Sequence, residues 1–204
     1  EEESAGAASV STSQVAGWLG VTSPSASSML KRLTGLGFVR QIGRGEFGLT
    51  DEGRAHALQV VRLHRLLETF LVERLGVPLE DAHGEAEVLE HHLSEELGAR
   101  IAADLGHPGH DPHGDPIPGV DGAVAPVRGE RLRDVRAGES GRVTRVSDRD
   151  AELLGYLART GLVPGARCDV VRHEPFGGPV VVRVDGVEVA VPTGAADAVF
   201  VEVG

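Results

Sequence analysis

Apolar residues in the first half of the chain recur three and four positions apart, the spacing that places them on one face of an α-helix. This pattern predicts four helices, at residues 12–19, 22–36, 50–75 and 79–104. Gly20 and Gly37 follow the first two, where a glycine commonly ends a helix, and Thr22 can cap the start of the second. Residues 38–42 and 46–49 flank a Gly-Arg-Gly turn, so they predict a β-hairpin before the third helix.

Two of these helices have an apolar face that we expect to be buried. In the helix at 22–36 the face consists of Ala26, Met29, Leu30 and Leu33. In the helix at 79–104 it consists of Ala82, Ala86, Leu89, Leu93, Leu97 and Ile101. The second stripe predicts one helix over the whole of this range.

The pattern changes after the last of these helices. Residues 107–126 are rich in Gly, Pro, His and Asp without periodicity, which predicts a linker or an ordered loop. Short Val-rich runs then predict strands at residues 143–146, 168–171, 180–184, 187–191 and 199–203. Asp185-Gly186 is a two-residue hairpin signal, and only residues 150–160 have a helical pattern. We expect a small β-barrel with one helical insertion.

Composition narrows the class of protein. The chain has 204 residues, of which 41% are hydrophobic, enough for an ordinary core. Its single cysteine, Cys168, excludes a disulfide framework and a Cys-rich zinc module. No apolar run approaches the roughly 20 residues that span a bilayer, and the start Glu1-Glu2-Glu3-Ser4 does not resemble a signal peptide. We therefore expect a soluble cytoplasmic protein.

The formal net charge of −11 argues against a uniformly basic nucleic-acid-binding protein, but the charge is unevenly distributed. Residues 11–66 contain seven Lys or Arg and three Asp or Glu, a net charge of +4. Residues 67–104 contain two Lys or Arg and ten Asp or Glu, a net charge of −8. A basic segment thus precedes an acidic one, and the two are candidates for different ligands.

A short helix, a glycine turn, a capped second helix and a hairpin are the order of a winged helix-turn-helix. The leading end of its second helix meets base edges, and its hairpin reaches the phosphate backbone. A winged helix that binds only protein is the alternative, and the local charge of +4 favours DNA. Few residues here suit bidentate base contacts, so we expect modest direct readout, helped by DNA shape and by paired subunits on two half-sites. The predicted DNA-binding residues are Thr22, Ser23, Pro24, Ser25, Ser28, Lys31, Arg32 and Arg44.

Two successive helices present His and Glu residues that share a face. His64 and Glu68 are four apart on one helix, and at 100° per residue the candidates on the next helix span an arc of about 100°. An acidic solvated face is the alternative. Carboxylates crowded beside an apolar stripe repel one another unless a cation lies among them, which favours a metal site. The candidate metal ligands are His64, Glu68, His83, Glu87, Glu90 and His91.

These ligands indicate which metal and which kind of function to expect. Imidazole and carboxylate groups without a thiolate suit a borderline-hard divalent ion such as Mn²⁺ or Fe²⁺. A metalloenzyme that hydrolyses a substrate with this cluster is one possible function, but it needs an open coordination position and a cleft. A C-terminal domain that binds a Pro-rich peptide is disfavoured, because only Tyr156, Phe176 and Phe200 supply aromatic rings after residue 127. We expect a protein that is not an enzyme.

Several motifs along the chain match a known family. They are Ser13-Gln14-Val15-Ala16, Leu36-Gly37-Phe38-Val39, Leu49-Thr50-Asp51-Glu52-Gly53, His64-Arg65-Leu66-Leu67-Glu68, the run from Ala82 to His91 and the Pro-Ile-Pro segment at 112–119. They resemble the metal-dependent repressors of the diphtheria toxin repressor and manganese transport regulator family. Residues 157–165 are similar to the SH3-like domain that this family shares with the small ferrous-transport A proteins.

The resemblance implies an α+β fold with three domains. They are a winged helix-turn-helix DNA-binding domain at 1–57, a helical metal-binding and dimerisation domain with a Pro/Gly-rich linker at 58–126, and an SH3-like domain at 127–204. It also implies a homodimer that binds a palindromic double-stranded DNA operator when loaded with metal and represses metal-uptake genes.

The resemblance further assigns the ligands to two sites. His64, Glu68 and His83 correspond to an ancillary site, and Glu87, Glu90 and His91 to a primary site. The iron-responsive branch has Cys at the position of Glu87, whereas the manganese-responsive branch has Glu. A hard oxygen ligand at this position favours Mn²⁺, with Fe²⁺ as the alternative.

The chain departs from the family pattern at two points. In the family, a first helix donates a primary-site ligand. This helix has no counterpart here apart from Glu1-Glu2-Glu3, which resembles its end. Ser28 stands where the family has a base-reading Gln. In the iron-responsive branch the SH3-like domain adds acceptors to the ancillary site, and Asp148 and Asp150 are the candidates here.

Overall fold

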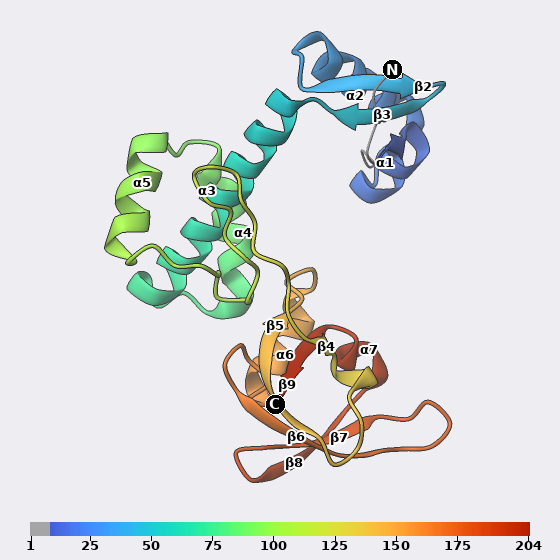
Figure 1. The fold of residues 1–204 in the computed structure, drawn as a ribbon, viewed down its shortest axis with the longest axis vertical. Coiled ribbons are helices and arrows are strands. Elements are labelled where there is room, and N and C mark those ends of the chain that lie inside the picture. The colour runs from blue at the N-terminus through green and yellow to red at the C-terminus, as the bar shows by residue number, and fades with distance from the viewer. Residues whose placement is uncertain (1–8) are drawn as a thin grey trace. The chain divides into compact units, whose positions relative to one another are not determined.

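The computed structural model describes residues 9–204, so the Glu1-Glu2-Glu3 match lies outside the described residues. The chain forms two compact units, divided between Val60 and Val61 (Figure 1). Both helices and sheets are present, as the predicted α+β class requires.

The first unit is a winged helix. Its elements are β1 (Val10–Ser11), α1 (Thr12–Leu19), α2 (Ser23–Gly35), β2 (Val39–Gly43), β3 (Glu46–Leu49) and the start of α3 (Asp51–Leu75). The three strands form an antiparallel sheet in the order β1-β3-β2. The predicted helices and hairpin are confirmed. Strand β1 was not predicted, because two residues are too few for a periodic pattern.

Local capping explains the sharp turn between α1 and α2. Ser11 and Gln14 form a capping box at the start of α1, and Gly20 ends it in the left-handed conformation at φ 62°. Thr22 accepts the N–H of Ser25, and Pro24 fits the first turn of α2.

The buried face of α2 is narrower than the sequence pattern predicts. Ala26 and Leu30, four residues apart, are buried, but Met29 and Leu33 are exposed, so the prediction for these two is wrong. A unit this small buries only a limited share of its surface, so one stripe of α2 is covered and the rest of the helix stays exposed.

The predicted helix at 79–104 is two helices, α4 (Leu79–Glu90) and α5 (Glu95–Asp104). Ser94 accepts the N–H of Leu97 and starts α5, because a serine at this position satisfies a free donor of the new helix. The apolar stripe is therefore interrupted. Ala82, Ala86 and Ile101 are buried as predicted, and Leu93 is partly buried, whereas Leu89 and Leu97 are exposed, contrary to the prediction.

The Gly- and Pro-rich segment is an ordered loop where it approaches these helices. Ile117 is buried in the same apolar cluster as Leu66 and Leu71 of α3 and Ile101 of α5. The loop therefore contributes to the helical core of the second unit.

The C-terminal part of this unit is built on one curved sheet. Its elements are β4 (Glu130–Arg131), the 3₁₀ turn η1 (Leu132–Asp134), β5 (Ser140–Val146), α6 (Ala151–Arg159), β6 (Arg167–His173), β7 (Val180–Val184), β8 (Val187–Val191), α7 (Thr193–Ala196) and β9 (Val199–Val203). The strands are antiparallel in the order β4-β9-β5-β6-β7-β8. All five predicted strands and the helix are confirmed, whereas β4, η1 and α7 are too short to give a pattern.

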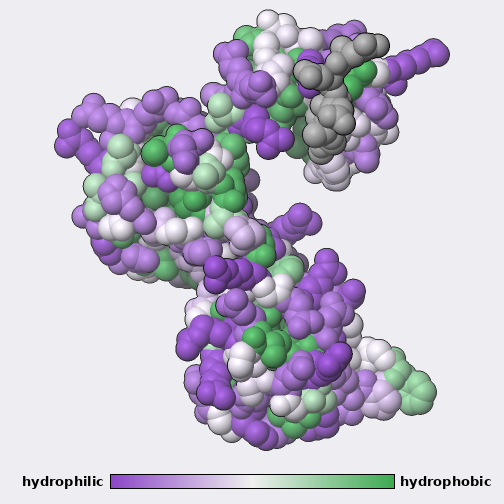
Figure 2. Space-filling model, in the orientation of Figure 1, coloured by the Kyte–Doolittle hydropathy of each residue, from purple (hydrophilic) through white to green (hydrophobic). Residues whose placement is uncertain are grey.

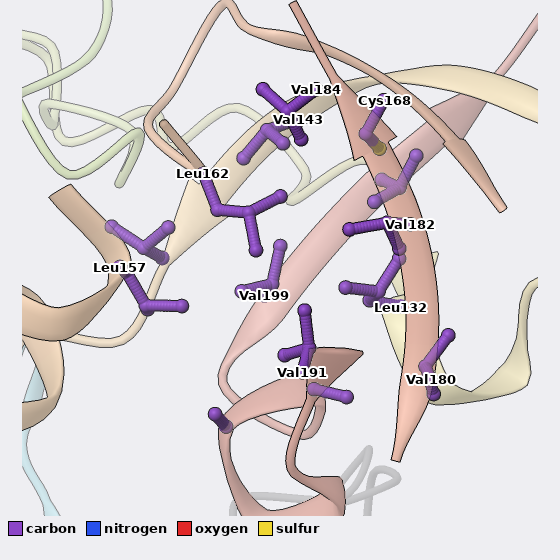
Figure 3. Packing of buried hydrophobic residues seen from close by; sticks show 14 of the residues in the cluster. Leu132, Val143, Leu157, Leu162, Cys168, Val180, Val182, Val184, Val191 and Val199 are labelled. Carbon is purple, nitrogen blue, oxygen red and sulfur yellow. The ribbon is translucent and has the colours of Figure 1, made fainter. Parts of the chain in front are cut away.

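The predicted closure into a barrel is wrong, because the outer strands β4 and β8 do not pair with each other and the sheet stays open. Short segments complete the core instead. Leu132 follows β4 and Ala196 lies in α7, and both belong to the same buried cluster as the strand valines. Figure 3 shows labelled members of this cluster, among them Leu132, Leu162 and Val199, gathered on the inner side of the sheet.

No helix among residues 9–204 is long and apolar enough to cross a membrane.

A glycine in the first turn of α3 gives a stability test. A Cβ on Gly53 would overlap the carbonyl oxygen of Phe38, so Gly53→Ala should destabilise the protein by about 2–3 kcal/mol. Gly17 in α1 has open space, so Gly17→Ala should instead stabilise it, by up to about 1 kcal/mol. Urea denaturation of both variants checks this, and equal stabilities would show that the close approach of Gly53 is unimportant.

Candidate metal centre

Three side chains from α3 and α4 converge on one point. His64 and Glu68 are one helical turn apart on α3, and His83 lies on α4. His64 Nε2 lies 3.0 Å from Glu68 Oε1, His83 Nδ1 lies 2.9 Å from the same oxygen, and the two nitrogens are 3.1 Å apart. Adjacent ligands of an octahedral ion with bonds of about 2.1 Å are also about 3 Å apart. The predicted ancillary ligands are therefore brought together at a spacing that fits a divalent cation.

The second oxygen of Glu68 faces His113, a histidine that is not among the predicted ligands. Glu68 is 0% exposed, and its Oε2 lies 3.8 Å from Nδ1 of the equally buried His113. This distance is too long for a hydrogen bond, and neither buried atom has a hydrogen-bond partner among residues 9–204. Glu68, Asp111 and His113 form a second group whose ligand atoms lie within 4.8 Å of one another. Two buried polar atoms without partners fit a site completed by an ion.

Asp111 folds the loop that brings His113 to Glu68. Its Oδ1 accepts the N–H groups of His113 and Asp115, each at 2.9 Å. His113 Nε2 lies 3.3 Å from the carbonyl oxygen of Leu79, at the start of α4. In the sequence, Asp111 and His113 are two candidate ligands separated by one proline. Their spacing does not show which helix the loop contacts, so they could not be assigned to the site.

The charge states of this cluster depend on one another. Burial alone would raise the pKa of Glu68, but the imidazoles of His113, His64 and His83 outweigh it and hold that pKa well below its usual range. Burial opposes protonation of His64, yet Glu68 and Glu90 raise its pKa to about 9. The pKa of His113 is also raised, against burial, by Glu68 and Asp111.

Asp111 has the opposite shift. Its own burial, followed by the charge of Glu68, raises the pKa of Asp111 to about 7. The cluster thus holds one firmly ionised carboxylate, Glu68, beside two histidines, His64 and His113, whose protonated forms are favoured. A divalent cation can replace these protons.

The predicted primary ligands are less tightly assembled. Glu90 Oε2 lies 2.8 Å from His64 Nδ1, which connects it to the first group, and Glu90 Oε1 lies 3.8 Å from His91 Nε2. Glu87 Oε1 lies 3.6 Å from His83 Nε2. The side chains of Glu87 and His91 are 65% and 73% exposed. Within residues 9–204, Glu87, Glu90 and His91 do not form a group of converging ligand atoms.

The two acidic candidates of the SH3-like part have different environments. Asp148 Oδ2 lies 3.8 Å from His83 Nδ1, at the edge of the first group. Asp150 instead caps α6, where its carboxylate accepts the N–H groups of Glu152 and Leu153.

The residues predicted to bind DNA all lie in the first unit. Thr22 precedes α2, and Arg44 lies in the turn between β2 and β3. The other six are on α2, namely Ser23, Pro24, Ser25, Ser28, Lys31 and Arg32. All eight are exposed.

Comparison with known proteins connects both units to regulators. Residues 50–119 match the family model of the iron dependent repressor metal binding and dimerisation domain, and residues 130–203 match the FeoA domain. The iron-dependent repressor IdeR of Mycobacterium tuberculosis is 35% identical over 201 residues, which cover 93% of this chain and 87% of that protein. The diphtheria toxin repressor of Corynebacterium efficiens is 32% identical over 189 residues, or 88% of this chain and 81% of that protein.

A solved structure agrees with these matches. A manganese-dependent transcriptional repressor in complex with manganese is 43% identical, with a TM-score of 0.87, over 96% of this chain and 91% of that one. Such relatives are metal-sensing transcriptional repressors and not enzymes, which confirms the choice of a regulator over a metalloenzyme. The chain belongs to the family of metal-dependent transcriptional repressors that includes the iron-dependent repressors and the diphtheria toxin repressor.

Proposed function

We propose that this protein is a dimeric repressor that senses Mn²⁺, with Fe²⁺ as the alternative, and binds an operator upstream of metal-uptake genes. The observation that supports a metal sensor most directly is the fully buried Glu68 carboxylate, whose ion-pair partners within the described residues are histidines. Three imidazoles neutralise it only when they carry protons, whereas a divalent cation does so directly.

Two sets of residues would hold the metal. His64, Glu68 and His83 form the first set, and Asp148 lies beside it. Glu68 also belongs to the group with Asp111 and His113, so its two oxygens can serve both. Glu87, Glu90 and His91 would form the primary site. The ion supplies positive charge that offsets the crowded carboxylates.

The choice of Mn²⁺ rests on ligand chemistry and on one relative. Oxygen and imidazole ligands without a thiolate suit a hard ion. The similar structure named above was solved with manganese bound, whereas the curated relatives named above include iron-dependent repressors.

Dimer formation is supported by apolar surface on the helical part of the second unit. The matching family model is described as a dimerisation domain. Figure 2 shows apolar surface among polar side chains where α3, α4 and α5 lie, and Val88, Leu89 and Leu97 on α4 and α5 are exposed. A second copy of the chain would cover such residues.

Metal binding would act on DNA binding by shifting a population of conformations. Without metal, the negative charges of Glu68 and Glu90 are offset only while neighbouring histidines carry protons, which disfavours the compact arrangement of α3 and α4 once these protons are lost. Metal supplies the positive charge in their place and favours the dimer geometry in which both winged helices fit successive major grooves of a palindromic operator. Helix α3 starts in the first unit, which carries the predicted DNA-binding residues, and it continues into the second unit, where it carries the candidate ligands His64 and Glu68.

DNA binding should depend on the metal. With Mn²⁺ present, the affinity of the full-length chain for its operator should rise by at least about 10-fold, because ligand and DNA favour the same state. Fluorescence anisotropy with and without Mn²⁺ measures this, and Mg²⁺ at equal concentration controls for ionic effects. Equal affinities with Mn²⁺, with Fe²⁺ and without metal would refute the proposed function.

The ligand at position 87 should set the metal preference. Glu87→Cys replaces a hard oxygen with a soft thiolate, so it should improve the response to Fe²⁺, Co²⁺ and Zn²⁺ relative to Mn²⁺. Operator-shift titrations with each metal test this ranking. Glu85→Cys is the matched control, since Glu85 is exposed on the same helix but is not a candidate ligand. An unchanged ranking in Glu87→Cys would contradict the argument from ligand hardness.

The basic residues of the winged helix should act through DNA phosphates. Lys31→Ala should weaken binding to all sequences and lower the slope of log affinity against log salt by about 1 per removed contact. Arg100→Ala, on α5 and paired with Glu96, should leave the slope unchanged. If Lys31→Ala keeps the wild-type slope, Lys31 does not contact DNA.

A further inference from the structure

An arginine of the SH3-like part reaches the loop that carries Asp111 and His113. Arg145 lies on β5, and its Nε donates to Asp115 Oδ2 at 2.9 Å. Its guanidinium also lies over the ring of Phe200, 5.0 Å from the centroid. Asp115 is buried, and the Arg145 side chain is only 22% exposed. This ion pair is therefore largely shielded from water. Charges attract each other more strongly in such a shielded position than at the exposed surface.

The same loop is bound from its other side by α3. Arg65 Nη2 lies 3.4 Å from Asp115 Oδ1, and Arg65 Nε lies 3.5 Å from Asp111 Oδ2. Arg62, one turn earlier, donates to the carbonyl oxygen of Pro118 at 2.7 Å. Asp115 thus connects an arginine of α3 to an arginine of β5, and the loop is fixed between them.

Backbone contacts show that β5 fixes the residue that faces Glu68. The N–H of Val146 donates to the carbonyl oxygen of His113 at 2.8 Å. Gly114 has φ 90°, and a Cβ there would overlap the carbonyl oxygen of Thr144. The main chain at His113 therefore lies directly against β5. Two residues further along the loop, Asp115 is bound by Arg145 of the same strand.

The charges explain why these arginines do not neutralise Glu68. Arg65 and Arg145 contact Asp111 and Asp115, which leaves Glu68 with histidine partners. We propose that Arg145 is a positioning residue of the metal centre, which holds Asp111 and His113 against Glu68 through Asp115. This inference rests on the proposed function, and it gives the SH3-like part a role in metal binding beyond the acidic side chain of Asp148.

Positioning and simple electrostatics predict opposite effects. If Arg145 acted only through its charge, its removal would leave the site more negative and would strengthen the binding of a divalent cation. If it positions the loop, its removal loosens Asp111 and His113 and weakens binding. Arg145→Lys separates these further, since it keeps the charge but loses the planar guanidinium that Asp115 and Phe200 contact.

The test compares the wild-type chain with Arg145→Met, Arg145→Lys and the control Arg142→Met. Arg142 lies on the same strand, and it donates to the carbonyl oxygen of Gly165. Titration calorimetry with Mn²⁺ gives the affinity, and hydrogen–deuterium exchange of the metal-free proteins follows the amides of Asp111, Gly114 and Ile117, which are hydrogen-bonded within the loop.

We expect Arg145→Met to increase exchange in the loop and to weaken Mn²⁺ binding by about 10-fold. Arg145→Lys should change both in the same direction by less, and Arg142→Met should change neither. Should the Met variant fail to fold, weaker binding by Arg145→Lys still supports positioning, because the charge is unchanged. Unchanged or stronger Mn²⁺ binding in the folded Arg145 variants would overturn the inference. Failure of the wild-type chain to bind Mn²⁺ would overturn the proposed function instead.

Discussion

The candidate metal centre depends on one buried carboxylate. Glu68 has no exposed surface, and its two oxygens face His64 and His83 on one side and His113 on the other. A buried carboxylate is costly unless it is paired, and removing the partners of a buried charge is strongly destabilising. The turn of α3 that carries Glu68, the approach of α4 and the ordered loop at 109–118 all serve to surround it.

Some of this centre could be predicted from the sequence, because helix geometry fixes which residues share a face. The four-residue spacing of His64 and Glu68 indicated neighbours on α3, and His83 joins them as expected. Asp111 and His113 could not be predicted in the same way. They lie in a loop without periodicity, and contacts with α3, α4 and β5 place them beside Glu68.

The errors in the fold prediction have a similar cause. The apolar spacing continues through residues 91–94, so it cannot show that the helix stops at Glu90 and that Ser94 caps a new one. Met29 and Leu97 satisfy the helical pattern and are nevertheless exposed, because a pattern identifies an apolar face and not the surface that covers it. The open sheet of the SH3-like part also depends on short segments, such as α7, that have no periodic signal.

The central claim is that Glu68 is a metal ligand. The alternative is that Glu68 only forms ion pairs with its histidine neighbours. The most direct test is the shift of the thermal unfolding midpoint on addition of Mn²⁺, measured for the wild-type chain, Glu68→Gln and the exposed control Glu85→Gln. With Mn²⁺ at about 100 times its Kd, the wild-type midpoint should rise by about 5–10 °C. Glu85→Gln should show the same rise and Glu68→Gln a much smaller one. An equal rise in all three proteins would contradict the account.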